Sequence, residues 1–149
     1  MKSTLRTRRA RLAGALCALG LATLSFAVAA DEATTILKCG IVYGKVKLLG
    51  YRGGIRVEDS DQLREGESKR YQPVLYRGTR YAFFGAGDQS IKDLDIYVYD
   101  ASGNLLAHDD DNSDTAVTVF APRSTGQFQV IVKNFRGDPG WYHMAMATD

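Results

Sequence analysis

The sequence has few of the residues, and none of the motifs, from which a peptidase active site is usually built. It contains two histidines, His108 and His143, and neither an H-E-x-x-H nor a G-x-S-x-G motif occurs in it. His108 precedes Asp109, and such a pair can supply a base and the group that orients it, but no convincing nucleophile lies near it in the sequence. We therefore expect a protein that is not an enzyme.

Acidic residues are absent before Asp31. The first thirty residues instead combine a basic start with an Ala/Leu-rich stretch that closes on Ala27-Val28-Ala29-Ala30. This order is typical of a signal peptide, so residues 1–30 are predicted to be one, with periplasmic or secreted localisation of the remainder. The alternative is an uncleaved membrane anchor, but Gly14, Gly20, Thr23 and Ser25 dilute the apolar stretch. We expect no stable membrane insertion after the signal is removed.

Positive charge is scarce once that segment is gone. Lys+Arg falls from 19 to 14 while Asp+Glu stays at 17, so the net charge changes from +2 to near −3. Nucleic-acid binding loses its electrostatic basis at this charge, and we exclude it.

Cysteine is also scarce. Cys39 is the only one after residue 30, so the exported chain cannot form an internal disulfide. A lone thiol in an oxidising compartment is either buried or paired with a second chain. We expect Cys39 to be buried, because free cysteine is among the most buried residue types.

Residues 31–66 carry apolar residues at both helical and strand spacing. Their many glycines weaken a helix, so the assignment of this N-terminal extension stays open between helix and strand, leaning to strand and loop, with a polar connector over 57–68. From about residue 67 to 149 the sequence becomes a series of short runs rich in Val, Ile, Tyr, Phe and Thr between turn residues. This pattern predicts an all-β fold, an antiparallel β-sandwich.

One hairpin is predicted in detail. Leu94, Ile96 and Val98 alternate with polar residues, and a turn follows in which Asp100 can accept backbone hydrogen bonds and Gly103 can adopt a left-handed conformation. We expect Leu105 and Leu106 to continue the hairpin. The odd-numbered residues from Asp93 to Tyr99 should then lie on its outer, solvated face.

Several pieces of this half resemble a known family. "GTRYAFFGAGD", "DLDIYVYDASGNLLAHDDD" and "TVFAPRSTGQFQVIVKN" are similar to the bacterial pre-peptidase C-terminal domain. The matching positions are Gly78, Asp93, Leu94, Asp95, Gly103, Ala121, Pro122 and Gly126. The resemblance covers about residues 67–147, and it implies a β-sandwich with jelly-roll character. Such domains usually follow secreted peptidases, and some relatives bind matrix proteins, polysaccharide or calcium. No peptidase motif accompanies these pieces in the sequence, so we expect a stand-alone copy of the domain.

Two groups of residues are candidate sites. Clustered carboxylate and amide oxygens suit Ca²⁺, and the predicted calcium ligands are Asp93, Asp95, Asp109, Asp111, Asn112 and Asp114. The alternative is a solvated acidic turn that discourages edge pairing. Outward aromatic rings can stack on sugars or anchor a protein, and the predicted partner-binding residues are Tyr97, Tyr99, Trp141 and Tyr142.

The sequence therefore predicts an exported, non-catalytic binding module for a protein or polysaccharide partner, with Ca²⁺ as a candidate stabilising ligand. The alternative is a structural or inhibitory protein that acts on an envelope or secreted enzyme such as a peptidase.

Overall fold

The computed structural model describes residues 16–149, and side-chain surroundings from residue 31 onward except at residue 57. One helix, α1 (Leu16–Leu48), precedes ten strands. The strands are β1 (Ile55–Leu63), β2 (Ser68–Tyr71), β3 (Val74–Leu75), β4 (Tyr81–Gly87), β5 (Ile91–Tyr99), β6 (Leu105–Asp109), β7 (Thr115–Phe120), β8 (Gly126–Gln127), β9 (Gln129–Gly137) and β10 (Gly140–Thr148).

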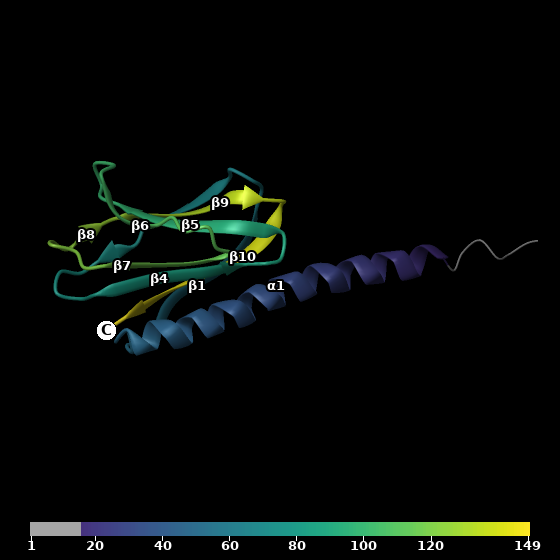
Figure 1. Ribbon diagram of the computed structural model, residues 1–149, viewed down its shortest axis with the longest axis horizontal. Helices are drawn as coiled ribbons and strands as arrows, with labels where there is room; N and C mark the ends of the chain where they lie inside the picture. The colour runs from purple at the N-terminus through teal and green to yellow at the C-terminus, as the bar shows by residue number, and fades with distance from the viewer. Residues whose placement is uncertain (1–15) are drawn as a thin grey trace, which may run out of the picture. The chain divides into compact units, whose positions relative to one another are not determined.

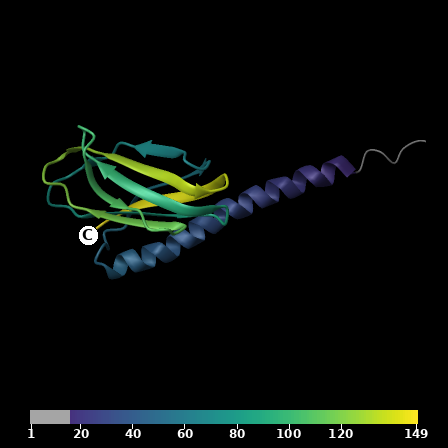
Figure 2. The same ribbon diagram turned by 45° about the horizontal axis from the view of Figure 1, so that its top comes forward.

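The strands form two antiparallel four-stranded sheets that face each other (Figures 1 and 2). Sheet A has the order β1-β10-β4-β7, and sheet B has the order β2-β9-β5-β6. The short strands β3 and β8 pair separately. Neighbouring strands are mostly not consecutive in the chain, as in a jelly roll. The predicted all-β sandwich is confirmed.

The space between the sheets holds the main core. Alternate residues of β5 and β9 point into it from sheet B, where they meet alternate residues of β4 and β10 from sheet A. The largest fully buried side chains here are Tyr142, Phe83, Leu75, Ile91, Leu94, Ile96, Val98, Val130 and Val132. The alternation read from the sequence thus identified the inward face of β5 correctly.

The predicted hairpin is also present. β5 pairs with β6 in antiparallel register. The Asp100 carboxylate accepts hydrogen bonds from the backbone N–H groups of Ser102 and Asn104 at 2.9 and 2.8 Å. Gly103 has a φ of 87°, the left-handed conformation that glycine adopts without strain.

For residues 31–66 the structure departs from the lean toward strand and loop in the first part and from the polar connector in the second. Residues 31–48 belong to α1, and the predicted polar connector contains most of β1, an edge strand of sheet A. The helix forms because its buried face, Thr35, Cys39, Val42 and Val46, covers the outer face of sheet A. Tertiary burial therefore outweighs the cost of the glycines in the helix.

A second, smaller core lies under α1. It joins Cys39, Val42, Val46 and Tyr51 to Ala82, Phe84, Ala86, Ala145 and Ala147 on sheet A. Cys39 is buried, as predicted. Within the described residues, no helix combines the length and the apolar character needed to cross a membrane.

Candidate functional site

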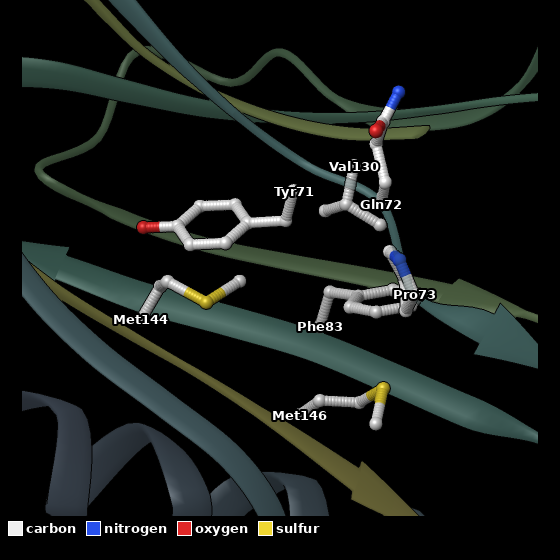
Figure 3. A pocket seen from close by; sticks show the side chains of 7 residues that line it. All are labelled: Tyr71, Gln72, Pro73, Phe83, Val130, Met144 and Met146. Atoms are coloured by element: carbon white, nitrogen blue, oxygen red, sulfur yellow. The ribbon is translucent and has the colours of Figure 1, made fainter. Parts of the chain in front are cut away.

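Segment 71–76 lies against the inward-facing side chains of β4 and β10 at one side of the sandwich. A cavity of about 190 Å³ enters the sandwich there, lined by Tyr71, Gln72, Pro73, Phe83, Val130, Met144 and Met146 (Figure 3). Its walls are almost entirely apolar. The two methionine side chains and the Phe83 ring lie across from Tyr71 and Pro73, and flexible thioethers of this kind adapt to different guests.

A second cavity, of about 470 Å³, continues along the same side of the sandwich. Met146 lines both cavities, and the second one also has Arg56, Val74, Tyr76, Thr79, Tyr81, Thr148 and Asp149 around it. We call the two together the seam groove. Val74 and Tyr76 stand on its rim with 54% and 59% of their surface exposed. A large apolar side chain at a cavity mouth is typical of a contact surface for another molecule.

A polar network closes one end of the seam groove. The Tyr71 hydroxyl donates to the Asp59 carboxylate at 2.8 Å and lies 2.6 Å from the Tyr142 hydroxyl. Lys69 forms ion pairs with Asp59 at 2.9 Å and Asp61 at 2.6 Å. Burial is the main cause that raises the pKa of Tyr142 to about 12 and that of Tyr71 further. Both phenols therefore stay protonated at neutral pH and hold the wall in place.

The acidic residues of β5 do not lie on a wet face. Asp93 and Asp95 are each only 3% exposed. Their side chains leave the main core, as expected, but they are covered there. One oxygen of Asp93 is buried without a hydrogen-bond partner, and Asp95 accepts a hydrogen bond from the Tyr97 hydroxyl at 2.6 Å. The expectation of solvation was wrong for these two residues.

Negative charge accumulates around them. Burial, and then the nearby charges of Asp93, Asp109 and Asp110, raise the pKa of Asp95, while its hydrogen bond with Tyr97 opposes the rise. Burial and the charges of Asp109, Asp93 and Asp110 likewise raise the pKa of Asp111. Asp93 thus contributes to the electrostatic surroundings of both Asp95 and Asp111.

Two other predicted ligands have structural partners. Asp109 accepts hydrogen bonds from the backbone N–H groups of Val117 and Asp111, and Asp114 forms an ion pair with Lys38. Asn112 is exposed. Across the described residues, no group of three or more His, Cys, Asp and Glu side chains is arranged to hold a metal ion. Calcium binding therefore stays a prediction.

The predicted aromatic surface is divided. Tyr142 is fully buried in the main core, so it cannot contact a partner, and its assignment was wrong. Trp141 is half-buried on the opposite face of the same strand. Tyr97 and Tyr99 are half-buried neighbours on sheet B, with ring centroids 6.4 Å apart, and His108 stacks on Tyr97. Only this pair forms a continuous aromatic surface among the four predicted residues.

A Ser–His–Glu arrangement lies on the outer face of sheet A. The Ser60 hydroxyl is 2.7 Å from Nδ1 of His143, and the Glu58 carboxylate is 3.8 Å from Nε2. Burial lowers the pKa of His143, while Glu58 and Asp59 oppose that shift. Nearby Cys39 has its pKa raised to about 12, mainly by burial, so its thiol is a poor nucleophile.

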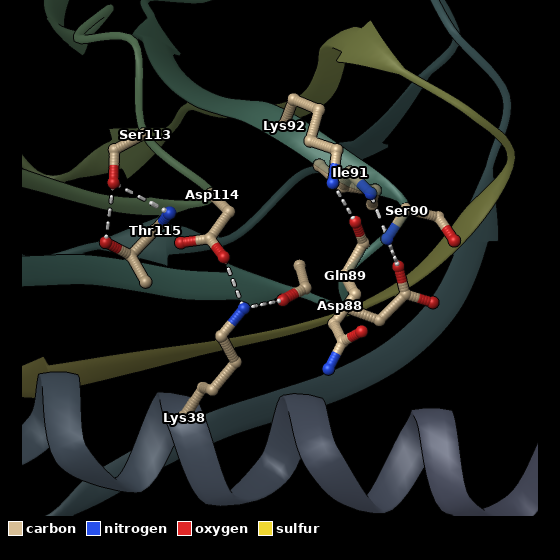
Figure 4. Close-up of polar contacts among 10 residues, drawn as sticks. Lys38, Asp88, Gln89, Ser90, Ile91, Lys92, Ser113, Asp114 and Thr115 are labelled. Atoms are coloured by element: carbon tan, nitrogen blue, oxygen red, sulfur yellow. Dashed lines mark hydrogen bonds and ion pairs between the residues drawn. The ribbon is translucent and has the colours of Figure 1, made fainter.

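Polar contacts at one end of the sandwich tie α1 to the loops (Figure 4). The Lys38 ammonium donates to the carbonyl of Gly87 at 2.7 Å and pairs with Asp114. In the adjacent turn, buried Asp88 accepts from the backbone N–H groups of Ser90 and Trp141, each at 2.8 Å. Every carboxylate here has a structural partner, so this cluster holds the fold together.

Sequence reasoning missed the seam groove, because its lining comes from several strands that are far apart in the chain. The one available signal was Pro73. Proline cannot donate to a sheet ladder and therefore marks an edge or an interruption, and here it separates β2 from β3.

No protein-family model matches the chain, and no curated protein matches it. Among solved structures, the chain is similar to PliG of Aeromonas hydrophila, a periplasmic lysozyme inhibitor of g-type lysozyme. The TM-score is 0.50 at 12% identity, over 66% of this chain and 90% of PliG. A de novo designed double-stranded β-helix has a TM-score of 0.36 at 13% identity, over 61% of this chain and 99% of that one, which supports no inference. The likeness to PliG concerns the fold.

Proposed function

We propose that the chain is an exported, non-catalytic β-sandwich that binds and inhibits an enzyme of the envelope or the extracellular medium. The observation that carries this proposal is the seam groove, an apolar, methionine-lined cavity with exposed Val74 and Tyr76 on its rim. A groove of this kind accepts an apolar side chain of a protein partner, and such anchors supply most of the binding energy of an interface. PliG, which has the same fold, inhibits a lysozyme.

Enzyme inhibition by the purified exported chain tests the proposal. Lysozymes of the g-type come first, followed by other lysozymes and envelope peptidases. We expect nanomolar to micromolar inhibition of one class. A panel without inhibition, together with sugar hits on a glycan array that vanish in Tyr97→Ala, would replace the proposal with the polysaccharide-binding alternative.

The seam groove is tested by Val74→Asp. This change places a charge where the contact with the partner's apolar surface must exclude water. The inhibition constant should therefore rise at least about thirtyfold. Leu105→Asp is the matched control, since Leu105 is similarly exposed but lies on β6, away from the groove. Equal losses in both variants would argue against the groove as the contact surface.

Calcium stabilisation is a second proposal, and the partnerless buried oxygen of Asp93 favours it. A cation beside Asp93 would neutralise one of the charges that, after burial, raise the pKa values of Asp95 and Asp111. A site filled to 100 times its Kd adds about 2.7 kcal/mol to the free energy of unfolding. Identical melting curves in excess Ca²⁺ and in chelator would show that calcium does not stabilise the fold.

A further inference from the structure

The outward face of α1 is an exposed apolar surface that the sandwich does not use. Leu37, Ile41 and Leu48 are 73%, 67% and 83% exposed. At 3.6 residues per turn they share one face of the helix, opposite the buried Val42 and Val46. A continuous apolar stripe of this kind on an exported protein marks a contact with another molecule.

Two glycines on this face have no explanation within a single chain. Gly40 and Gly44 lie in the helix interior, where glycine weakens a helix relative to alanine. A Cβ added at either position would meet no atom within 4 Å, so neither glycine is required by the packing of its own fold. Glycine in such places permits the close approach of a second backbone.

We propose that two copies of this chain pair through α1 in antiparallel orientation. One register sets every large residue of the face against a small one. Leu37 faces Gly44 of the second copy, Ile41 faces its Gly40, and Leu48 faces its Ala33. The surface is thus complementary to itself, which a twofold dimer requires. A parallel pair would instead set leucine against leucine and glycine against glycine.

Charge favours the same orientation. In the exported chain proposed above, Asp31 and Glu32 lie in the first turn that remains of α1, outside the apolar face, and Lys45 and Lys47 lie in its last turn. Antiparallel pairing places each acidic end beside the basic end of the second copy and opposes the two helix dipoles. Parallel pairing would bring like charges together.

The contact uses none of the residues that line the seam groove, so a dimer leaves the proposed inhibitory site open. One helix face is smaller than the roughly 800 Å² per partner of a standard interface. We therefore expect a dimer with a Kd on the order of micromolar, which sedimentation velocity can resolve over a concentration series.

The first test uses variants that should stabilise the monomer but weaken the dimer. Gly40→Ala and Gly44→Ala should raise the melting temperature measured at low concentration, because alanine favours the helix and has room. The same variants should raise the dimer Kd at least about tenfold, because the added methyl group separates the backbones. Unchanged association in both variants would overturn the proposal.

A charge on the face supplies a matched pair of variants. Leu37→Asp should abolish association, whereas Leu105→Asp should not, since Leu105 is exposed but lies on β6, away from α1. A chain that stays monomeric at about 1 mM, hundreds of times the expected Kd, would refute the proposal. So would a monomer that binds phospholipid vesicles through Leu37.

Cysteine cross-linking then tests the orientation. In an antiparallel pair Ile41 lies next to the twofold axis, so Ile41→Cys should form a disulfide-linked dimer on oxidation. Ala33→Cys and Leu48→Cys should each stay unlinked alone and should link when mixed. Native Cys39 is buried and gives no background. Efficient linking of Ala33→Cys with itself would show a parallel pair and contradict the proposed register.

Discussion

The two outer faces of the sandwich differ in the size and charge of their side chains. The outer face of sheet A is built from small apolar residues, mainly Ala82, Ala86, Ala145 and Ala147, and α1 lies on it. The outer face of sheet B carries Asp93, Asp95, Tyr97 and Tyr99 on its β5 strand, and no helix is packed on it within the described residues. Small side chains let a helix approach a sheet closely, whereas carboxylates are costly to cover with an apolar helix face. The side chains on the outer face of each sheet therefore determine whether a helix can pack on it.

The largest expected effect tests whether the small core under α1 is as firmly packed as the main core. Phe83 and Phe84 are adjacent on β4, and they point to the main core and to the helix respectively. Phe83→Ala and Phe84→Ala should each cost about 3–5 kcal/mol in the free energy of unfolding measured in urea.

Val119→Ala is the control, because Val119 is half exposed on the part of sheet A that α1 leaves open. It should cost well under ~1.5 kcal/mol. A cost for Phe84→Ala close to that of the control would mean that α1 covers the sheet only loosely.

Overpacking under the helix should have an intermediate effect. Ala145 is fully buried between β10 and α1. Ala145→Leu adds volume that the rigid sheet cannot accommodate, so α1 must shift, at a cost of about 1–3 kcal/mol. The helical signal in circular dichroism should fall before the β signal on heating. A single coincident transition with unchanged midpoint would contradict close helix packing.

The two faces should respond to pH in opposite directions. The pKa of Asp95 is raised in the folded state, so its protonated form stabilises the fold. That contribution is present below the ordinary aspartate pKa and is lost as pH rises through the raised value. Asp95→Asn should therefore stabilise the protein near pH 7, on the order of 1 kcal/mol, and the gain should vanish toward pH 4. Urea unfolding at both pH values measures it.

His143, on the outer face of sheet A, should change the stability in the opposite direction with pH. Its folded pKa is lowered, so its contribution is present above the ordinary histidine pKa and is lost as pH falls through the lowered value. Acidification below about pH 6 should weaken the wild type more than His143→Gln, by a few tenths of a kcal/mol. Parallel curves for the two proteins would show that His143 titrates normally.

The smallest effect concerns the link between α1 and the loops. Lys38→Met removes the pair with Asp114 and the bond to Gly87 while keeping most of the side-chain volume. Both partners are partly exposed, so the loss should be about 0.5–1 kcal/mol and should shrink in high salt. Thermal melts at low and high salt check this expectation.

Much of the fold could be predicted from periodicity alone. The strand runs after residue 68 appear where short runs rich in Val, Ile and Tyr were found, because alternation reports directly on a sheet with one buried face. The helix could not be found this way, since Gly40 and Gly44 argue against it locally. A better signal lay elsewhere: the runs "YAFFGAG" and "WYHMAMAT" are apolar on both faces, so both faces need a cover.

The candidate site was predicted less well for a physical reason. Sequence patterns report which way a side chain points from its own strand, as they did for Leu94 and Ile96. They do not report what another segment places over it, which is why Asp93 and Asp95 were expected in water. The seam groove depends on contacts between Pro73, Phe83 and Met146, which no local pattern encodes.

The position of β10 has a consequence for how the protein is made. This strand comes last in the chain, yet it lies inside sheet A and pairs with both β1 and β4. A product that stops before Gly140 leaves two strands without their neighbour and α1 without half of its platform. We therefore expect that the polypeptide cannot complete its fold until residues 140–148 are available to pair with β1 and β4, and that copies truncated before Gly140 are degraded.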